Sequence, residues 1–443
     1  MSTTMPFRDY RPETRTLLGA QLVFNLGFYA VVPFLAGAMS SEYGLDAAAI
    51  GLVLGARTFS QQGMFLLGGA LADRWGARRA ILTGCLVRIA GYATLATASG
   101  FIVFLLGAVL TGAGGALFSP ALESWLSHAD RPSGTGERGG GKPRRSVFVW
   151  LAITGEIGAV LGPLLGSALL GWGFDAALTA GISVFTVVTA LLWYRLPAGP
   201  VHPDARDDAG EHPPLVHVLR CLRNGPFVTF CILAGTSMLV YHQLYFLIPV
   251  ELDRRSIDAA WLGALFFLAS VLILLLQLPV SAVGQRLGPG RALAAGFVLE
   301  AGACAVAAAT AAHPGTPAVS VAPLMGTVAL LAVGHMLLKP TILALVPQFV
   351  PDQEAMSRRG AYYGLVATCG GTAVLIGNTV LGRLLELTDQ HHWWPGTPWV
   401  PQVLLTLLAA AALPVVLSRH TTSESSDSLS PTAPADPPAC GTS

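Results

Sequence analysis

Five ionisable side chains lie inside long apolar stretches of the sequence. They are Arg57, Arg88, Glu156, Glu300 and Lys339. A charged side chain at the centre of a bilayer costs about 2.5–3.5 kcal/mol on insertion scales, so each of these residues is a candidate for function. A carboxyl group in such surroundings can take up and release a proton, because desolvation disfavours its charged form. We therefore expect Glu156, about ten residues into its apolar stretch at 1.5 Å per residue, to couple proton movement, with Glu300 as the second candidate.

The apolar stretches have the length that membrane-spanning helices require, about 20 residues. The chain is 53% hydrophobic and 12% charged, whereas soluble domains are roughly 25% charged. We predict an all-α membrane protein whose twelve spans lie near 16–39, 48–71, 80–98, 101–123, 146–171, 175–195, 225–250, 260–283, 291–311, 322–346, 361–382 and 399–418.

The basic residues outside the spans gather on one side of the expected membrane. Only Arg254, Arg255 and Arg383 fall in loops of the other side. Because positive loops stay in the cytoplasm, we expect both termini to be cytoplasmic. The chain uses 24 Arg and 2 Lys with abundant Ala, Gly and Pro. This bias suggests a GC-rich bacterial genome and hence a bacterial inner membrane.

The loop between the second and third spans reads GALADRWGARR, residues 69–79. Glycines permit a tight turn and close helix approach, and an aspartate accepts charge-assisted hydrogen bonds. The expected gating residues are Gly69, Asp73, Arg74, Gly76, Arg78 and Arg79, with Glu123 paired to Arg74 or Arg78. The pattern resembles the loop signature of the major facilitator superfamily. The stretch 51–84 is similar to an enterobacterial twelve-helix multidrug resistance subgroup of it.

This resemblance implies the major facilitator fold, with two pseudo-symmetric six-helix bundles that give alternating access. An internal echo supports a duplication: Asp46-Ala47-Ala48 and Gly51 recur as Asp258-Ala259-Ala260 and Gly263. The expected parts are a first bundle, 1–195, a cytoplasmic linker, 196–224, a second bundle, 225–418, and a disordered cytoplasmic tail, 419–443.

The fifth span contains a run of glycines around a Gly-Pro step, in the segment GEIGAVLGPLLGS. It resembles the antiporter signature of drug:proton exchangers, although the spacing matches only in part. The residues concerned are Gly158, Gly162, Pro163 and Gly166. Small residues four apart also serve ordinary close helix packing. The fourth-span arginine of many such antiporters should fall near Ala108 and is absent, so their usual proton site cannot be carried over.

In the resembling fold the first, fourth, seventh and tenth helices line a central cavity. The expected cavity residues are Asn25, Phe28, Tyr29, Gln61, Tyr241, His242, Tyr245, His335 and Lys339. Aromatic faces with a few polar groups suit amphipathic organic molecules. Arg57 shares a helix face with Gln61. It could balance a carboxylate, attract an anionic substrate or lock two helices together, and Arg88 is a second candidate charge partner. The third and ninth helices are peripheral in this fold, which ranks Glu300 below Glu156.

Together these features predict a proton-driven exporter of drug-like or secondary-metabolite small molecules. A nutrient uptake symporter or facilitator is the first alternative, because a fold does not decide function, and a non-transporting membrane sensor is the second. The loops carry no nucleophile–base pair, metal set or Walker motif, so we expect neither an enzyme nor an ATPase. We expect no cofactor and no nucleic acid, and a monomer whose partners are a small-molecule substrate, protons and the lipid bilayer.

Overall fold

The computed structural model of the chain describes residues 7, 10–129, 147–197, 221–311, 317–350 and 359–427. All regular structure in these ranges is helical. The α-helices of the first half are α1 Pro12–Val31, α2 Leu35–Ser41, α3 Ala47–Gln62, α4 Phe65–Trp75, α5 Ala77–Ala96, α6 Phe101–Ala129, α7 Val147–Leu170 and α8 Phe174–Arg195. Those of the second half are α10 Gly225–Tyr241, α11 Leu247–Arg254, α12 Ala260–Leu287, α13 Pro289–Thr310, α14 Pro317–Leu345, α15 Arg359–Gln390 and α16 Val400–Asp427. Short 3-10 turns follow as η2 Val32–Phe34, η4 His242–Leu244, η5 Val346–Phe349 and η7 Thr397–Trp399.

Among the described residues, 11 helical segments are long and apolar enough to cross a membrane. The remaining expected span, 48–71, is divided into α3 and α4 by a break at Gly63 and Met64. α3 alone is shorter than the hydrocarbon layer, so the two pieces make this crossing together. The predicted all-α fold of two six-helix bundles is confirmed. Residues 198–220 and 428–443 lie outside the described ranges, and α16 continues to Asp427, past the expected start of the tail.

The second half repeats the first in detail. In both, a helix gives way to a short 3-10 turn and a second helix, as α1–η2–α2 and α10–η4–α11. The next crossing ends in both at a glycine with positive φ, Gly76 at 86° and Gly288 at 78°, a conformation that side chains disfavour. The glycine of the signature segment is therefore a helix stop that the second half has kept.

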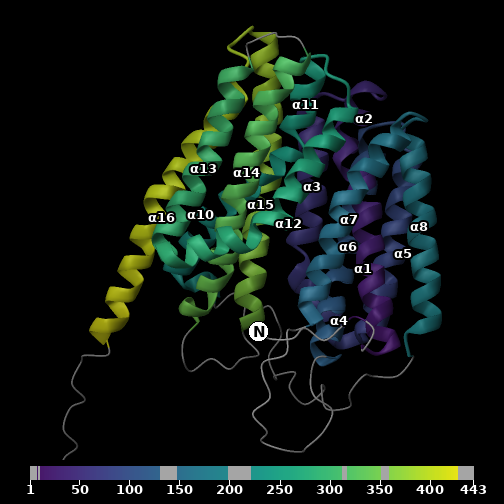
Figure 1. Ribbon diagram of the computed structural model, residues 1–443, viewed down its shortest axis with the longest axis horizontal. Helices are drawn as coiled ribbons and strands as arrows, with labels where there is room; N and C mark the ends of the chain where they lie inside the picture. The colour runs from purple at the N-terminus through teal and green to yellow at the C-terminus, as the bar shows by residue number, and fades with distance from the viewer. Residues whose placement is uncertain are drawn as a thin grey trace, which may run out of the picture.

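Figure 1 shows the two bundles side by side, each with its helices running between the same two ends. We call the end at which α8 finishes and α10 begins the linker end, at the bottom of the figure, and the opposite end, near α2 and α11, the far end. Asn224 starts α10 at the linker end, because its side chain accepts a hydrogen bond from the Phe227 amide at 3.1 Å.

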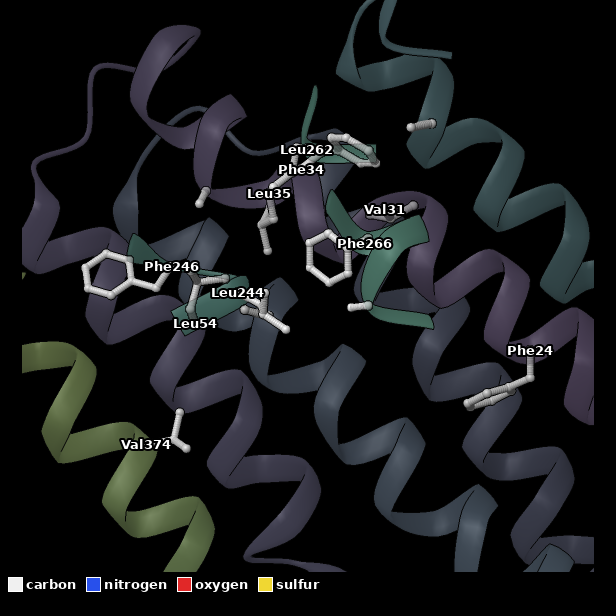
Figure 2. Packing of buried hydrophobic residues seen from close by; sticks show 14 of the residues in the cluster. Phe24, Val31, Phe34, Leu35, Leu54, Leu244, Phe246, Leu262, Phe266 and Val374 are labelled. Atoms are coloured by element: carbon white, nitrogen blue, oxygen red, sulfur yellow. The ribbon is translucent and has the colours of Figure 1, made fainter. Parts of the chain in front are cut away.

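The hydrophobic core crosses from one half to the other at the far end. One large cluster fills the first half and continues into the second through residues such as Phe246, Phe266 and Val374. Figure 2 shows these side chains close to Phe34 and Leu54 of the first half. The other cluster, around Phe227 and Phe349, stays within the second half near the linker end. Apolar packing therefore joins the halves at one end of the molecule.

The repeated Asp-Ala-Ala motif precedes the two helices that pack against the opposite half, α3 and α12. The Asp46 carboxylate accepts a hydrogen bond from the Ala49 amide at 2.7 Å at the start of α3. Asp258 accepts one from the Ala260 amide at 2.8 Å at the start of α12. Side-chain acceptors of this kind satisfy amide groups that a helix start leaves without partners.

The glycine that follows each motif is the point of closest approach. A β-carbon on Gly51 of α3 would overlap the carbonyl oxygen of Asn378 in α15. One on Gly263 of α12 would lie 2.7 Å from Oγ of Ser167 and 3.0 Å from the carbonyl oxygen of Pro163, both in α7. The two helix–helix contacts between the halves therefore need glycine at equivalent positions, as small-residue packing in membranes requires.

A polar network reinforces the far end. The Ala48 amide at the start of α3 donates to Glu386 of α15 at 2.8 Å, which caps a helix of one half with an acid of the other. Glu386 also accepts from Arg383 at 2.7 Å. Within the second half, Arg254 of α11 pairs with Asp389 of α15. These bonds fix α15 against both α3 and α11.

Replacing Gly51 with alanine is expected to force α3 and α15 apart, because neither backbone can yield without moving a helix. Overpacking of this kind costs about 1–3 kcal/mol. Pulsed electron resonance between spin labels at residues 43 and 391 should report a longer far-end distance in Gly51→Ala. Gly302→Ala is the matched control, since no heavy atom lies within 4 Å of its added carbon. An unchanged distance in Gly51→Ala would contradict the packing argument.

Candidate functional site

An aromatic cluster forms where α1, η4 and α14 meet between the halves. A side-chain hydrogen bond joins Tyr29 of the first half to Tyr245 of the second. Tyr241 stacks on His335 with ring centroids 3.9 Å apart and an interplanar angle of 15°. His242 lies 5.6 Å from Tyr245 between ring centroids. The structure thus brings these expected cavity residues together from both halves.

Glu156 and Lys339 carry opposite charges on either side of this cluster. Glu156, in α7, is partly exposed, and Lys339, in α14, is exposed. Their charges interact across the boundary between the halves, and Glu156 also interacts with Tyr29 and Tyr241. No ion pair between described side chains joins the two. Neither side chain is fully buried.

The backbone beside Glu156 is held by a bond from α1. Asn25 donates through Nδ2 to the carbonyl oxygen of Gly155 at 3.1 Å. Asn25 is therefore a positioning residue for α7, in addition to being a member of the expected cavity set. The sequence showed Asn25 as a polar residue in an apolar helix but gave no sign of this partner.

The glycines of α7 form a ridge that fits against α1. A β-carbon on Gly158 would lie 2.6 Å from the carbonyl oxygen of Leu22, and one on Gly162 would lie 2.5 Å from Cβ of Tyr29. Gly166 meets Phe34 and Ala30 in the same way. The opposite face of α7 contacts α12, where Ser270 donates to the carbonyl oxygen of Ala159 at 3.2 Å. α7, with Pro163 within it, thus packs between its own half and the other.

The two arginines expected to be charge partners have no carboxylate beside them among the described side chains. Arg57 donates to Oε1 of Gln61 at 2.7 Å and lies over the Phe28 ring, 4.5 Å from its centroid. Arg88 donates to the carbonyl oxygen of Thr111 at 3.3 Å. No described acid lies close to either guanidinium, so the role of these residues as charge partners stays a prediction.

Glu300 lies apart from the aromatic cluster, within the second half. It is fully buried in α13, where the Ser237 hydroxyl donates to Oε1 at 2.7 Å. Its Oε2 has no hydrogen-bond partner. Gly334 of α14 packs on its Cγ, where an added β-carbon would lie 2.9 Å away. The structure thus gives Glu300 a hydroxyl partner that the sequence did not reveal.

The signature segment is mostly helix, where a loop was expected. α4 runs to Trp75, so Gly76 alone separates it from α5. Gly69 has no heavy atom within 4 Å of a β-carbon position, whereas one on Gly68 would overlap the carbonyl oxygen of Ala116. The close approach assigned to Gly69 therefore belongs to Gly68, because that residue faces α6.

Among the described side chains, no ion pair joins Glu123 to Arg74 or Arg78, the partners predicted for it. Arg78 donates to the carbonyl oxygen of Trp193 at 3.0 Å and lies over its ring at 5.3 Å. Glu123 interacts instead with the charge of Lys339, across the boundary between the halves. Arg74 and Arg79 are exposed, and the side chain of Asp73 lies outside the described residues.

Three polar groups at the far end were missed as candidates. Gln243 donates to Oδ1 of Asn378 at 3.0 Å, and both are buried. Glu251, also buried, accepts from Arg255 at 3.2 Å and from the Trp399 indole at 3.3 Å. Amides within apolar stretches were a visible signal for Gln243 and Asn378. In the described ranges no group of three His, Cys, Asp or Glu side chains could hold a metal ion.

Comparison with known proteins identifies a family for most of the chain. The profile of the Major Facilitator Superfamily matches residues 17–377 and again residues 251–437. An uncharacterized MFS-type transporter of Mycobacterium tuberculosis is 32% identical over 397 residues, which cover 87% of this chain and 90% of that protein. The multidrug resistance protein MdtH of Yersinia pestis is 32% identical over 266 residues, 60% of this chain and 62% of that protein.

Solved structures of transporters share the fold. A peptide transporter POT in complex with alafosfalin matches with a TM-score of 0.71 at 17% identity, covering 94% of this chain and 97% of that one. The nucleoside transporter NupG matches with a TM-score of 0.74 at 16% identity, covering 91% of this chain and 99% of that one. At such identities the likeness concerns the fold alone.

Replacing Gly162 with alanine should destabilise the protein and displace Tyr29. The added carbon would lie 2.5 Å from Cβ of Tyr29 and 2.9 Å from the carbonyl oxygen of Leu26, and such overpacking costs about 1–3 kcal/mol. Thermal unfolding of the purified protein measures the loss. Gly155→Ala is the matched change on the same helix, where the nearest atom is the amide nitrogen of Asn25 at 3.1 Å. Equal stability of the two variants would refute the glycine ridge.

Proposed function

The chain belongs to the Major Facilitator Superfamily and is a multi-pass membrane transporter, and we propose that it exports drug-like or secondary-metabolite molecules by proton antiport. The observation that carries the proposal is the aromatic cluster of Tyr29, Tyr241, Tyr245 and His335 beside one acid, Glu156. Aromatic faces with few polar groups fit amphipathic organic compounds. The similarity to a multidrug resistance protein supports the same class of cargo.

The linker end is proposed to face the cytoplasm of a bacterial cell. The basic residues of the loops gather at that end, and positive loops stay inside. The halves are packed together at the far end, through Gly51 and Gly263. With this orientation we propose that the far end, where Gly51 and Gly263 join the halves, lies toward the outside of the inner membrane.

Coupling follows if the proton affinity of Glu156 differs between the two states of the transporter. Glu156 belongs to the first half and Lys339 to the second, so rocking of the halves changes the distance between their charges. A ligand shifts an equilibrium only by its differential affinity for the two states, and this holds for a proton. We propose that the proton leaves Glu156 in the state that brings Lys339 nearest to it.

Glu156→Gln is expected to abolish gradient-driven transport while leaving substrate binding in place, because glutamine keeps the shape and cannot release a proton. Efflux of several amphipathic compounds from vesicles should be compared with and without a proton gradient. Glu42→Gln, an exposed acid, is the matched control and should transport normally. Full gradient-driven activity in Glu156→Gln would transfer the role to Glu300, and wild-type transport that ignores the gradient would exclude antiport.

The direction of transport is tested with the same compounds in intact cells. Gradient-driven accumulation of a nutrient inside cells would replace export by uptake symport. Purified protein that binds a compound and moves none would identify a membrane sensor. Export leads because a multidrug resistance protein is among the similar proteins.

The signature segment is proposed to act in gating, with Asp73 as its acidic member. The equivalent position of the second half holds Gln285, so the two halves differ in charge there. Asp73→Asn should slow turnover without weakening substrate binding, because it removes acceptors that are used only when the linker end closes. Rate and affinity measured in vesicles separate the two effects. Asp175→Asn, an exposed far-end change, is the control, and an unaltered rate in Asp73→Asn would leave the segment without a gating role.

A further inference from the structure

The first half buries two guanidinium groups that lack an anionic partner. Arg57 is 4% exposed and Arg88 is 1% exposed. Nε of Arg57 and both terminal nitrogens of Arg88 are buried and have no hydrogen-bond partner. A buried arginine is normally paired, since an uncompensated buried charge is strongly unfavourable. These donors therefore call for an acceptor that the described residues do not supply.

The surroundings of the two arginines contain no acid among the described residues. The groups that interact with the charge of Arg57 are Arg88 and the tyrosines 29, 92 and 245. Those that interact with Arg88 include Tyr92 and Cys85. Arg57 and Arg88 thus lie close enough for their positive charges to repel each other. The nearby tyrosine hydroxyl groups are uncharged and do not neutralise them.

Aromatic rings pack against both guanidinium groups. Arg88 lies 4.0 Å from the Phe24 centroid, 5.5 Å from that of Phe185 and 5.6 Å from that of Phe28, and Arg57 lies 4.5 Å from the Phe28 centroid. Such cation–π contacts offset part of the desolvation of the charge. They use none of the N–H donors, so Nε of Arg57 and both terminal nitrogens of Arg88 stay without a partner.

The absence of a side chain at Gly115 lets Arg88 and Gln61 approach α6 closely. A β-carbon on Gly115 of α6 would lie 2.6 Å from Nη2 of Arg88 and 3.1 Å from Cδ of Gln61. Gln61 in turn accepts from Arg57 at 2.7 Å. Glycine at 115 therefore lets Gln61 and the two arginines share one place. Gln61 and Phe28 are partly exposed, so the group is not sealed from the space between the halves.

We propose that Arg57, Gln61 and Arg88 bind the carboxylate of an amphipathic aromatic acid. The inference rests on the proposed function in one respect, that such an acid belongs to the compounds carried. Guanidinium groups bind carboxylates through paired N–H donors. Phe28 and Tyr29, whose rings pack edge to face at 4.9 Å, offer an aromatic surface for the rest of the molecule. The bound carboxylate supplies the negative charge that the described surroundings of the two arginines lack.

The test compares two ligands of the same shape on the purified full-length chain in detergent and chloride-free buffer. 2-Naphthoate should raise the midpoint of thermal unfolding, because a ligand that binds only the folded state stabilises it, whereas uncharged 2-naphthamide should not. Arg57→Gln and Arg88→Gln should each lose the difference between the two ligands. Arg291→Gln removes an exposed arginine of the other half and should keep it.

Equal shifts from naphthoate and naphthamide in the wild-type chain would overturn the proposal, even if neither arginine variant folds. So would a naphthoate-specific shift that survives in both variants, or an equal shift from sodium chloride that the same variants lose, which would assign the site to an inorganic anion. Without ligand, Arg88→Met should unfold at a higher temperature, since it removes an uncompensated charge. A lower midpoint would make Arg88 a structural lock instead. The measurement needs no gradient, so its failure would leave the export proposal standing.

Discussion

The two halves of the protein are held together by close backbone packing at the far end, and the rest of the arrangement depends on it. Glycine at positions 51 and 263 lets α3 meet α15 and lets α12 meet α7. In a bilayer the apolar effect does little to join helices, so such close contact is a principal source of attraction. Because the helices meet there, Tyr29 reaches Tyr245 and the charge of Glu156 faces that of Lys339.

Much of this arrangement could be predicted from the sequence, because the relevant signals are local. The length of the apolar stretches predicted the membrane spans, and the repeated Asp-Ala-Ala motif with Gly51 and Gly263 indicated the duplication. The division of the second crossing at Gly63 could not be predicted, since the apolar run continues through it. Nor could the sequence show that Gly68, one residue from Gly69, is the glycine that faces α6. Both depend on which side of a helix meets a neighbour.

The partners of buried charges were the least predictable feature. An arginine that donates to a glutamine and a carbonyl oxygen, as Arg57 and Arg88 do, has the same sequence signature as one paired with an acid. Arg88 and Glu300 occupy equivalent places in the repeat, 212 residues apart, yet neither meets an opposite charge. Each half therefore buries an ionisable side chain, a guanidinium in the first and a carboxyl group in the second.

The two helix–helix contacts between the halves are equivalent in their topology as well as in their glycines. The second membrane-spanning helix of each half packs on the fifth of the other, as α3 on α15 and α12 on α7. This is the isologous geometry of a two-fold dimer, in which both partners present the same patch. Each half therefore presents to the other both a helix that begins after an Asp-Ala-Ala motif and the helix that receives its counterpart.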